Sequence, residues 1–389
     1  MRPRESAAQH WECFDMSNEV FPDPEAVRDA ESAGLVFSED KKTLLMCDSG
    51  SIEEAVIPAG VTGIGDCAFI RCPELAAVTL PASLVRIGKS AFAYCTALTD
   101  VEIPSGVTGI GEMAFKGCDS LKRAIISDGV ESIGEMAFNG CESLEKVTIP
   151  DSVTRIGKGA FIGCTELADV KLPANVTSIE EDVFRGCENL SKVVIPAGVT
   201  SIGEFAFSLC FSLSEVVIPD GVTEIGDMAF GCCSYLESVT IPFSVRRIGN
   251  YAFCRCRELR SVSLDYCTEP EETFDGFGSV PGAADPACAA EIGDYAFGEC
   301  ERLTRVEIPP GIVRIGDRTF VGCGRLTEVE IPDTVTVIGK KAFSGCTHLL
   351  HVTLPFRISE IAGDAFEGAA CEAEVRRDHP WVFKSPAGC

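Results

Sequence analysis

Hydrophobic residues recur along this chain with a fixed period. A phenylalanine returns every 23 residues from Phe69 to Phe253 and again from Phe297 to Phe366, so that thirteen units carry it. The one irregular spacing, between Phe253 and Phe297, is 44 residues. Self-similarity at such a period is typical of proteins built from stacked structural repeats. The pattern therefore predicts one elongated array rather than the two or three domains that 389 residues alone would suggest.

The order of polar and apolar positions within a unit predicts its elements. Most units follow the frame L-x-x-V-x-I-P-x-x-V-x-x-I-G-x-x-A-F-x-x-C-x-x, as residues 98–120 do. The L-x-x-V-x-I part alternates and is β-branched, which predicts a short strand that the following proline ends. The V-x-x-I-G part predicts a second short extended piece with a glycine at its corner. The A-F-x-x-C-x-x-L part has apolar residues at helical spacing and predicts a helical turn.

A single unit of this length cannot bury its own Leu, Val, Ile and Phe side chains, so neighbouring units must bury them by stacking. Parallel strands about 4.8 Å apart would give a rod or arc roughly 60 Å long. The predicted fold class is a β-rich repeat solenoid with short helical turns. We expect residues 1–33 to form an acidic N-terminal segment or cap, 34–370 the solenoid, and 371–389 a C-terminal cap or tail in which 371–383 are strand-like.

The unit signature resembles a known family. Over residues 52–368 the motif P-x-x-V-x-x-I-G-x-x-A-F-x-x-C-x-x-L is similar to the BspA-type, or Treponema-type, leucine-rich repeat, and residues 34–48 look like the opening segment of such arrays. The resemblance implies a right-handed, curved leucine-rich-repeat solenoid with a parallel sheet on one face. It also implies binding, because bacterial members are often surface proteins that adhere to host or matrix proteins, and members in protists are often surface or signalling proteins.

Cysteine is the most unusual feature of the composition. Twelve of the 21 cysteines lie three residues after the repeat phenylalanine: Cys72, Cys95, Cys118, Cys141, Cys164, Cys187, Cys210, Cys233, Cys256, Cys300, Cys323 and Cys346. The last unit has Ala369 there, so the position behaves as a small buried apolar group. We predict a ladder of reduced, packed thiols, which suits a reducing compartment.

The cysteines and histidines outside this pattern do not predict a metal site. Cys232 and Cys254 join the ladder members Cys233 and Cys256 in adjacent units, but the spacing differs from that of a zinc knuckle, and packing is the preferred interpretation. Cys346, His348 and His351 are close in sequence and are expected to point apart. We predict no metal and no cofactor.

The charge excludes several function classes. With 33 basic and 59 acidic residues the formal charge is −26, which argues against a nucleic-acid binder and against docking on an anionic membrane. No apolar run reaches the length of a membrane span, and the first residues lack the apolar core of a signal peptide. These features and the thiol ladder favour a cytoplasmic protein, with the cell surface as the alternative.

Motifs for catalysis are also missing. The run Gly109-x-Gly111-x-x-Ala114 matches a dinucleotide fingerprint, yet equivalent positions in other units hold Arg86 or Ser132, so the match is a by-product of the repeat. The sequence therefore predicts a protein without enzymatic activity. The least favoured alternative is a hydrolase that uses acidic residues of the sheet face, although no carboxylate pair stands out.

Two surfaces are candidates for binding a protein partner. The middle variable positions of the strands face away from the core, and several bear apolar or uncharged side chains. The predicted strip consists of Ile125, Thr148, Lys171, Val194, Val217 and Thr240. The second candidate is an arginine cluster just before the irregular spacing, which comprises Arg246, Arg247, Arg255, Arg257 and Arg260.

Residues 265–290 account for the irregular spacing. They hold six acidic residues and no basic one, and they are either a degenerate repeat or an excursion loop. We hypothesise that this segment folds over the arginine cluster. Together these observations predict a recognition or scaffold module for a protein partner, with a BspA-type surface adhesin as the alternative; oligomeric state is not predicted.

Overall fold

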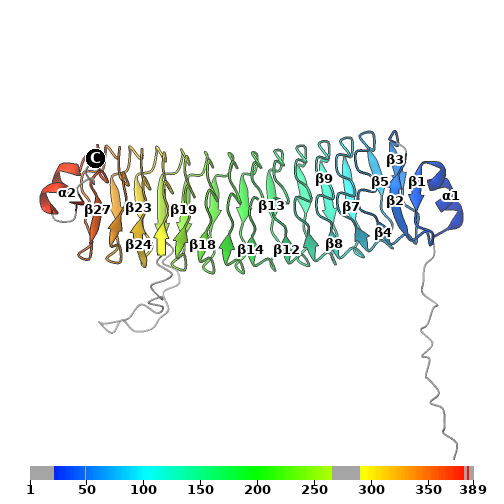
Figure 1. Cartoon of the computed structure of the whole chain (residues 1–389), viewed down its shortest axis with the longest axis horizontal. Coiled ribbons are helices and arrows are strands. Elements are labelled where there is room, and N and C mark those ends of the chain that lie inside the picture. The colour runs from blue at the N-terminus through cyan, green and yellow to red at the C-terminus, as the bar shows by residue number, and fades with distance from the viewer. Residues whose placement is uncertain (1–21, 49, 265–289, 381–382, 385–389) are drawn as a thin grey trace, which may run out of the picture.

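The structure is a computed structural model that describes residues 22–48, 50–264, 290–380 and 383–384. It is one elongated stack of short strands with a helix at each end, α1 (Pro24–Ser32) and α2 (Glu372–Asp378) (Figure 1). The single array that the phenylalanine period predicts is therefore confirmed.

The L-x-x-V-x-I segments form strands on one side of the rod, as predicted. These strands are β3 (Glu54–Val56), β5 (Ala77–Thr79), β7 (Asp100–Ile103), β9 (Arg123–Ile126), β11 (Lys146–Thr148), β13 (Asp169–Lys171), β15 (Lys192–Val194), β17 (Glu215–Val217), β19 (Ser238–Ile241), β21 (Ser261–Leu264), β23 (Arg305–Glu307) and β25 (Glu328–Glu330). They pair in parallel in groups of two (β3-β5), three (β7-β9-β11) and seven (β13 to β25). Within each group the middle residues lie side by side.

A second face carries a further parallel ladder. After β1 (Leu35–Phe37), which pairs antiparallel with β2, its strands are β2 (Thr43–Cys47), β4 (Gly63–Ile64), β6 (Arg86–Ile87), β8 (Gly109–Ile110), β10 (Ser132–Ile133), β12 (Arg155–Ile156), β14 (Ser178–Ile179), β16 (Ser201–Ile202), β18 (Glu224–Ile225), β20 (Arg247–Ile248), β22 (Ala290–Ile292), β24 (Ile312–Ile315), β26 (Val337–Ile338), β27 (Glu360–Ala362) and β28 (Phe383–Lys384). They make one seven-stranded and one nine-stranded sheet. The V-x-x-I-G pieces therefore also pair, in addition to the sheet expected on one face.

The interior is a set of columns that run the length of the rod. Successive repeat phenylalanines stack face to face, with centroids 5.1 Å apart for Phe69 and Phe92 and 5.0 Å apart for Phe343 and Phe366. Beside them all twelve ladder cysteines are buried free thiols, packed as predicted. Each thiol from Cys95 to Cys346 donates to a phenylalanine carbonyl of an earlier turn, as Cys187 Sγ does to Phe161 O at 3.2 Å.

The predicted helical turns are single hydrogen-bonded turns. Cys72 N donates to Phe69 O, three residues earlier, at 3.2 Å, while Phe69 N donates to Ala91 O of the next turn at 2.7 Å. A continuous helix cannot form here, because the residues two before and two after most repeat phenylalanines have positive φ. This face is therefore a stack of tight corners.

The C-terminal end differs from the expectation of a strand-like cap. Residues 372–378 form helix α2, and of the residues described after it Phe383–Lys384 form a strand. Acidic Glu372 and Glu374 in the first turn and Arg376 and Arg377 in the last complement the helix dipole, and Val375 is buried against the array. The prediction for 371–383 was wrong because it weighed strand propensity without these helix-end charges.

The irregular spacing leaves the stack intact. Ile248 of β20 pairs with Ile292 of β22, and Phe253 stacks on Phe297 at 5.2 Å. The turns on the two sides of the 44-residue spacing therefore meet directly, and no other turn lies between them. Residues 265–289 lie outside the described residues, so the hypothesis that the acidic segment covers the arginines stays a prediction.

Candidate interaction surfaces

The predicted strip lies on the outer face of the strands that contain L-x-x-V-x-I. Lys171, Val194, Val217 and Thr240 are direct neighbours across β13, β15, β17 and β19, and they form one uninterrupted row. Ile125 and Thr148 pair with each other in the separate three-stranded sheet. The structure thus places the six residues on one face in two groups.

Exposure distinguishes the members of this strip. Val194 is 63% exposed and Val217 58%, whereas Ile125 and Thr240 are half-buried. Lys192 and Glu215, the exposed neighbours of the two valines on the same strands, pair across β15 and β17 and give the apolar pair a charged edge. The valine pair is therefore the apolar centre of the longer group.

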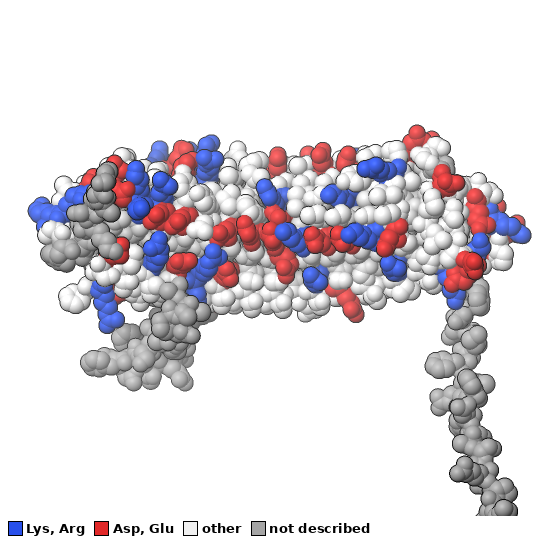
Figure 2. All heavy atoms as spheres, viewed as in Figure 1, with Lys and Arg blue, Asp and Glu red and all other residues white. Residues whose placement is uncertain are grey.

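The predicted arginine cluster is divided between faces. Arg247 on β20 binds Glu224 and Asp227 at 2.8 Å each, while Arg257, after the phenylalanine corner, lies 3.7 Å from Glu301. Arg246 and Arg260 are exposed at the ends of other segments. Acidic and basic side chains alternate along the visible face of the rod in Figure 2. These arginines do not form the single basic patch that a common binding role would require.

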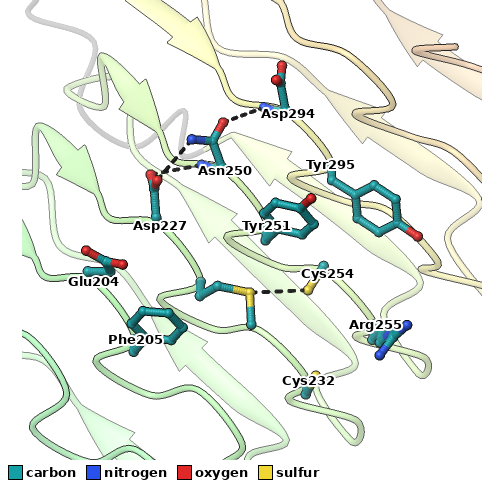
Figure 3. A pocket seen from close by; sticks show the side chains of 11 residues that line it. Glu204, Phe205, Asp227, Cys232, Asn250, Tyr251, Cys254, Arg255, Asp294 and Tyr295 are labelled. Atoms are coloured by element: carbon teal, nitrogen blue, oxygen red, sulfur yellow. Dashed lines mark hydrogen bonds between the residues drawn. The ribbon is translucent and has the colours of Figure 1, made fainter. Parts of the chain in front are cut away.

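Sequence reasoning missed a groove on the corner face. The groove has a volume of about 840 Å³ (Figure 3). Its lining consists of Glu204, Phe205, Asp227, Met228, Cys232, Asn250, Tyr251, Cys254, Arg255, Asp294 and Tyr295. These residues come from four consecutive turns.

Two columns of corner residues build this groove. Two residues before the repeat phenylalanine, the four turns carry Phe205, Met228, Tyr251 and Tyr295, all with positive φ. Two residues after it, four earlier turns have glycine with positive φ (Gly117, Gly140, Gly163 and Gly186), but the groove turns have Leu209, Cys232, Arg255 and Glu299 in the same conformation. Non-glycine residues adopt this conformation at a cost of about 1–3 kcal/mol. Arg71 and Tyr94 replace the glycine in two turns near the N-terminal end, so the signal that marks the site is a run of four consecutive turns without it.

Polar contacts fix the walls of the groove. Asn250 Nδ2 donates to Asp227 Oδ2 at 2.9 Å and Asn250 Oδ1 accepts from Asp294 N at 2.8 Å, as the dashed lines in Figure 3 show. The Tyr295 hydroxyl donates to Glu299, and Arg255 Nε donates to the other Glu299 oxygen at 3.0 Å. The lining is thus held by hydrogen bonds from one turn to the next.

These contacts also change the acidity of the wall residues. Burial, followed by the hydrogen bond to Glu299, raises the pKa of Tyr295 to about 12. The hydrogen bond from Tyr295 lowers the pKa of the Glu299 carboxyl, and Arg255 lowers it further. Tyr295 therefore remains a neutral donor and Glu299 a charged acceptor at neutral pH.

Sulfur atoms gather on one wall of the groove. Cys254 Sγ lies 3.7 Å from Met228 Sδ, and the Cys232 N–H donates to Cys254 O at 2.8 Å. A hydrogen bond from Cys254 lowers the pKa of the Cys232 thiol to about 6 despite burial, with help from Arg255 and Arg257. The same contact raises the pKa of Cys254. The pKa values of these two neighbouring thiols are therefore shifted in opposite directions.

The two ladder members considered with this pair lie elsewhere. Cys233 and Cys256 are fully buried, and burial raises the pKa of both thiols. The residues near the C-terminal end also diverge, since Cys346 is buried while His351 is exposed and contacts Glu374 at 3.0 Å. Within the described ranges no group of three or more His, Cys, Asp or Glu side chains is arranged to hold a metal ion.

No helix in the described part of the chain is both long and apolar enough to span a bilayer.

Comparison with known proteins identifies the family. A model of the BspA type leucine rich repeat region (6 copies) matches residues 45–168, 156–276 and 270–374. Among solved structures the chain is similar to a leucine-rich repeat protein from Bacteroides ovatus, with 31% identity over 90% of each chain and a TM-score of 0.71.

Two further structures show lower similarity. A leucine rich cell surface protein from Faecalibacterium prausnitzii is 29% identical over 81% of this chain and 91% of that one, with a TM-score of 0.40. A leucine-rich repeat protein from Eubacterium ventriosum is 21% identical over 91% and 94%, with a TM-score of 0.45. No curated protein matches. Since the family model covers most of its length, the chain belongs to the BspA-type leucine-rich repeat proteins.

Proposed function

We propose that this protein is a non-enzymatic recognition module that binds a protein partner on the sheet formed by β13 to β25. The observation that carries the proposal is the pair Val194 and Val217, two exposed valines that lie side by side on the longest uninterrupted sheet of this face. A solenoid presents such a sheet as an extended surface of fixed spacing.

The side chains around the pair suit a protein partner. Exposed apolar residues at the centre of a patch with a polar edge are the usual anatomy of a protein interface. Lys171 continues the row on one side, and Thr240 continues it on the other. We propose that Ile125 and Thr148 extend the contact onto the three-stranded sheet.

The arginines take a smaller part in this proposal. Arg247 forms ion pairs with Glu224 and Asp227, and these contacts link it to the preceding turn. Arg246, Arg257 and Arg260 remain candidates for secondary contacts with an acidic part of the partner. The family also supports a second form of the proposal, a surface adhesin whose partner is a host or matrix protein; the identity of the captured partner distinguishes the two.

A paired-substitution experiment tests the proposal. The full chain with Val194→Asp and Val217→Asp is compared with wild type in affinity capture from the native source, followed by mass spectrometry. The matched control is Val56→Asp on β3, because Val56 occupies the equivalent position and is 65% exposed. We expect a protein captured by wild type and by the control to be lost with the double variant, while the melting temperature stays near that of wild type.

The contrary result is equally clear. Equal recovery of every specific partner with the double variant, at unchanged melting temperature, would falsify binding through this sheet. A partner retained by the double variant and lost when groove residues are changed would place recognition on the corner face.

A further inference from the structure

The groove on the corner face contains three sulfur atoms from two consecutive turns. Met228 stands two residues before its repeat phenylalanine, Cys232 two after the same one, and Cys254 one after the next. Cys254 Sγ is 3.7 Å from Met228 Sδ, and all three residues line the groove. Cys232 lines the same wall as Cys254 (Figure 3), and its backbone N–H donates to Cys254 O at 2.8 Å.

We propose that Met228, Cys232 and Cys254 form a binding site for a soft monovalent cation, specifically Cu(I). Thiolate and thioether ligands suit soft ions such as Cu(I), whereas carboxylates suit hard ions such as Mg²⁺ and Ca²⁺. On binding, Cys254 releases its proton to solvent, so that the three sulfurs provide two thiolates and one thioether, a ligand set without nitrogen or oxygen.

The backbone of these turns supports a built site. Cys232 has φ +64°, in a position where four earlier turns have glycine. In this conformation its side chain projects into the groove, next to Cys254 on the following turn. Met228 also has positive φ, at 56°, and its side chain packs over Gly231, where a Cβ would meet the methionine methyl carbon at 2.9 Å. The missing side chain at Gly231 therefore leaves the space that the thioether occupies.

Two thiolates and one monovalent cation carry a net charge of −1, and the guanidinium of Arg255 lines the same groove, where it also binds Glu299 at 3.0 Å. A soft ion with a low coordination number is fully bound by these three sulfurs, so the site needs neither a water molecule nor a third acidic ligand.

The other cysteines of the described chain offer a direct contrast. The ladder thiols are buried among the phenylalanines and, from Cys95 on, donate their protons to backbone carbonyls. Cys47 and Cys72 form a second thiol pair near the N-terminal end. Cys67 is exposed. It lies two residues before its repeat phenylalanine, as Met228 does, and the next turn has Ser90 at that position. Cys47→Ser and Cys67→Ser are therefore matched controls, because each removes one accessible thiol outside the groove.

The test is an anaerobic Cu(I) titration of the full reduced chain, with bathocuproine disulfonate as the competing chelator. We expect wild type, Cys47→Ser and Cys67→Ser each to retain one equivalent that Cys232→Ser and Cys254→Ser lose. Met228→Leu should keep this equivalent with at least tenfold weaker affinity, since one ligand is removed and the side-chain volume is nearly conserved. X-ray absorption at the copper edge should show only sulfur ligands in wild type.

Two results would overturn the proposal. The first is equal Cu(I) uptake by wild type, Cys232→Ser and Cys254→Ser, with all three melting at similar temperatures. The second is a reduced protein that takes up no copper but forms a Cys232–Cys254 disulfide on exposure to air, with O₂ as the oxidant, which would assign the pair to redox chemistry. Because the sheet-face variants leave these residues untouched, failure here does not affect the proposed protein-binding role.

Discussion

Cys232 and Cys233 are consecutive residues in opposite environments. Cys233 is fully buried in the thiol column and donates to Phe207 O at 3.2 Å, whereas Cys232 faces the groove. Burial raises the pKa of Cys233, while the hydrogen bond from Cys254 lowers that of Cys232 to about 6. The same side chain therefore has a raised pKa in one column and a lowered pKa in the next.

The difference between the two columns shows where a repeat protein can acquire function. Interior positions must match their neighbours in every turn, because each side chain packs against its counterparts one turn away. Corner positions are constrained by backbone conformation and by hydrogen bonds between turns, and a glycine there can be replaced when a side chain brings a compensating contact. The groove arises where four consecutive turns make this replacement.

The largest expected effect is the loss of folding stability at alkaline pH, which the buried thiol column causes. The twelve ladder thiols must stay protonated in the folded chain, whereas in the unfolded chain they ionise above their ordinary value of 9.0. The stability that they provide is thus complete below about pH 9 and is lost as the pH rises, at about 1.4 kcal/mol per thiol and pH unit. We expect a loss on the order of 10 kcal/mol by pH 10.

Denaturant titrations of the reduced protein between pH 7 and pH 10 measure this loss. Replacing Cys164, Cys187 and Cys210 by alanine should reduce the slope by about a quarter, since three of the twelve thiols no longer titrate. A slope that is unchanged in this triple variant would mean that other groups cause the alkaline transition.

Alkylation of Cys232 should show the opposite behaviour. With a pKa of about 6, its thiolate fraction falls about tenfold between pH 7 and pH 5 and rises little above pH 7. Rates of iodoacetamide modification, followed by peptide mass spectrometry, should trace this curve. Cys254→Ala removes the main stabilising hydrogen bond and should move the midpoint upward; a wild-type midpoint at or above pH 8 contradicts the assignment.

Exchange of corner residues should give the smallest effect. Gly140→Ala should destabilise the chain by about 1 kcal/mol, since φ is +73° and the added Cβ meets nothing closer than 3.9 Å, so that only backbone strain opposes it. Cys232→Gly should relieve the same strain and stabilise by a similar amount. Chemical denaturation at pH 7 measures the change in the free energy of unfolding for both variants. If both substitutions stabilise the chain, or both destabilise it, backbone strain is not their shared cause.

The sequence predicts the interior far better than the corner face. The 23-residue period defines the stack, the buried phenylalanines and the thiol column, because each depends on one position that repeats in every turn. The outward row from Lys171 to Thr240 is equally predictable, since strand alternation alone sets it. The groove depends on positive φ at Phe205 or Cys232, which hydrophobic periodicity does not report.

Two other features could not be predicted from the sequence, for different reasons. Arg247 and Arg257 are close in sequence but lie on opposite sides of a corner, so a cluster in the sequence became separate ion pairs in the structure. Helix α2 depends on charges at its two ends, which compete with the strand propensity of its few apolar residues. The positions of the arginines depend on where the chain turns, and helix α2 depends on its charged ends. The pattern of hydrophobic residues reports neither.

The direct contact between the Phe253 and Phe297 turns gives the rod a natural insertion point. The chain leaves after β21 and resumes at β22, yet the columns continue in register across the junction. The entropy of closing a loop grows only with the logarithm of its length, so the junction is nearly indifferent to how many residues it spans. New sequence could be grafted there, or the native sequence shortened, while the scaffold on both sides keeps its alignment.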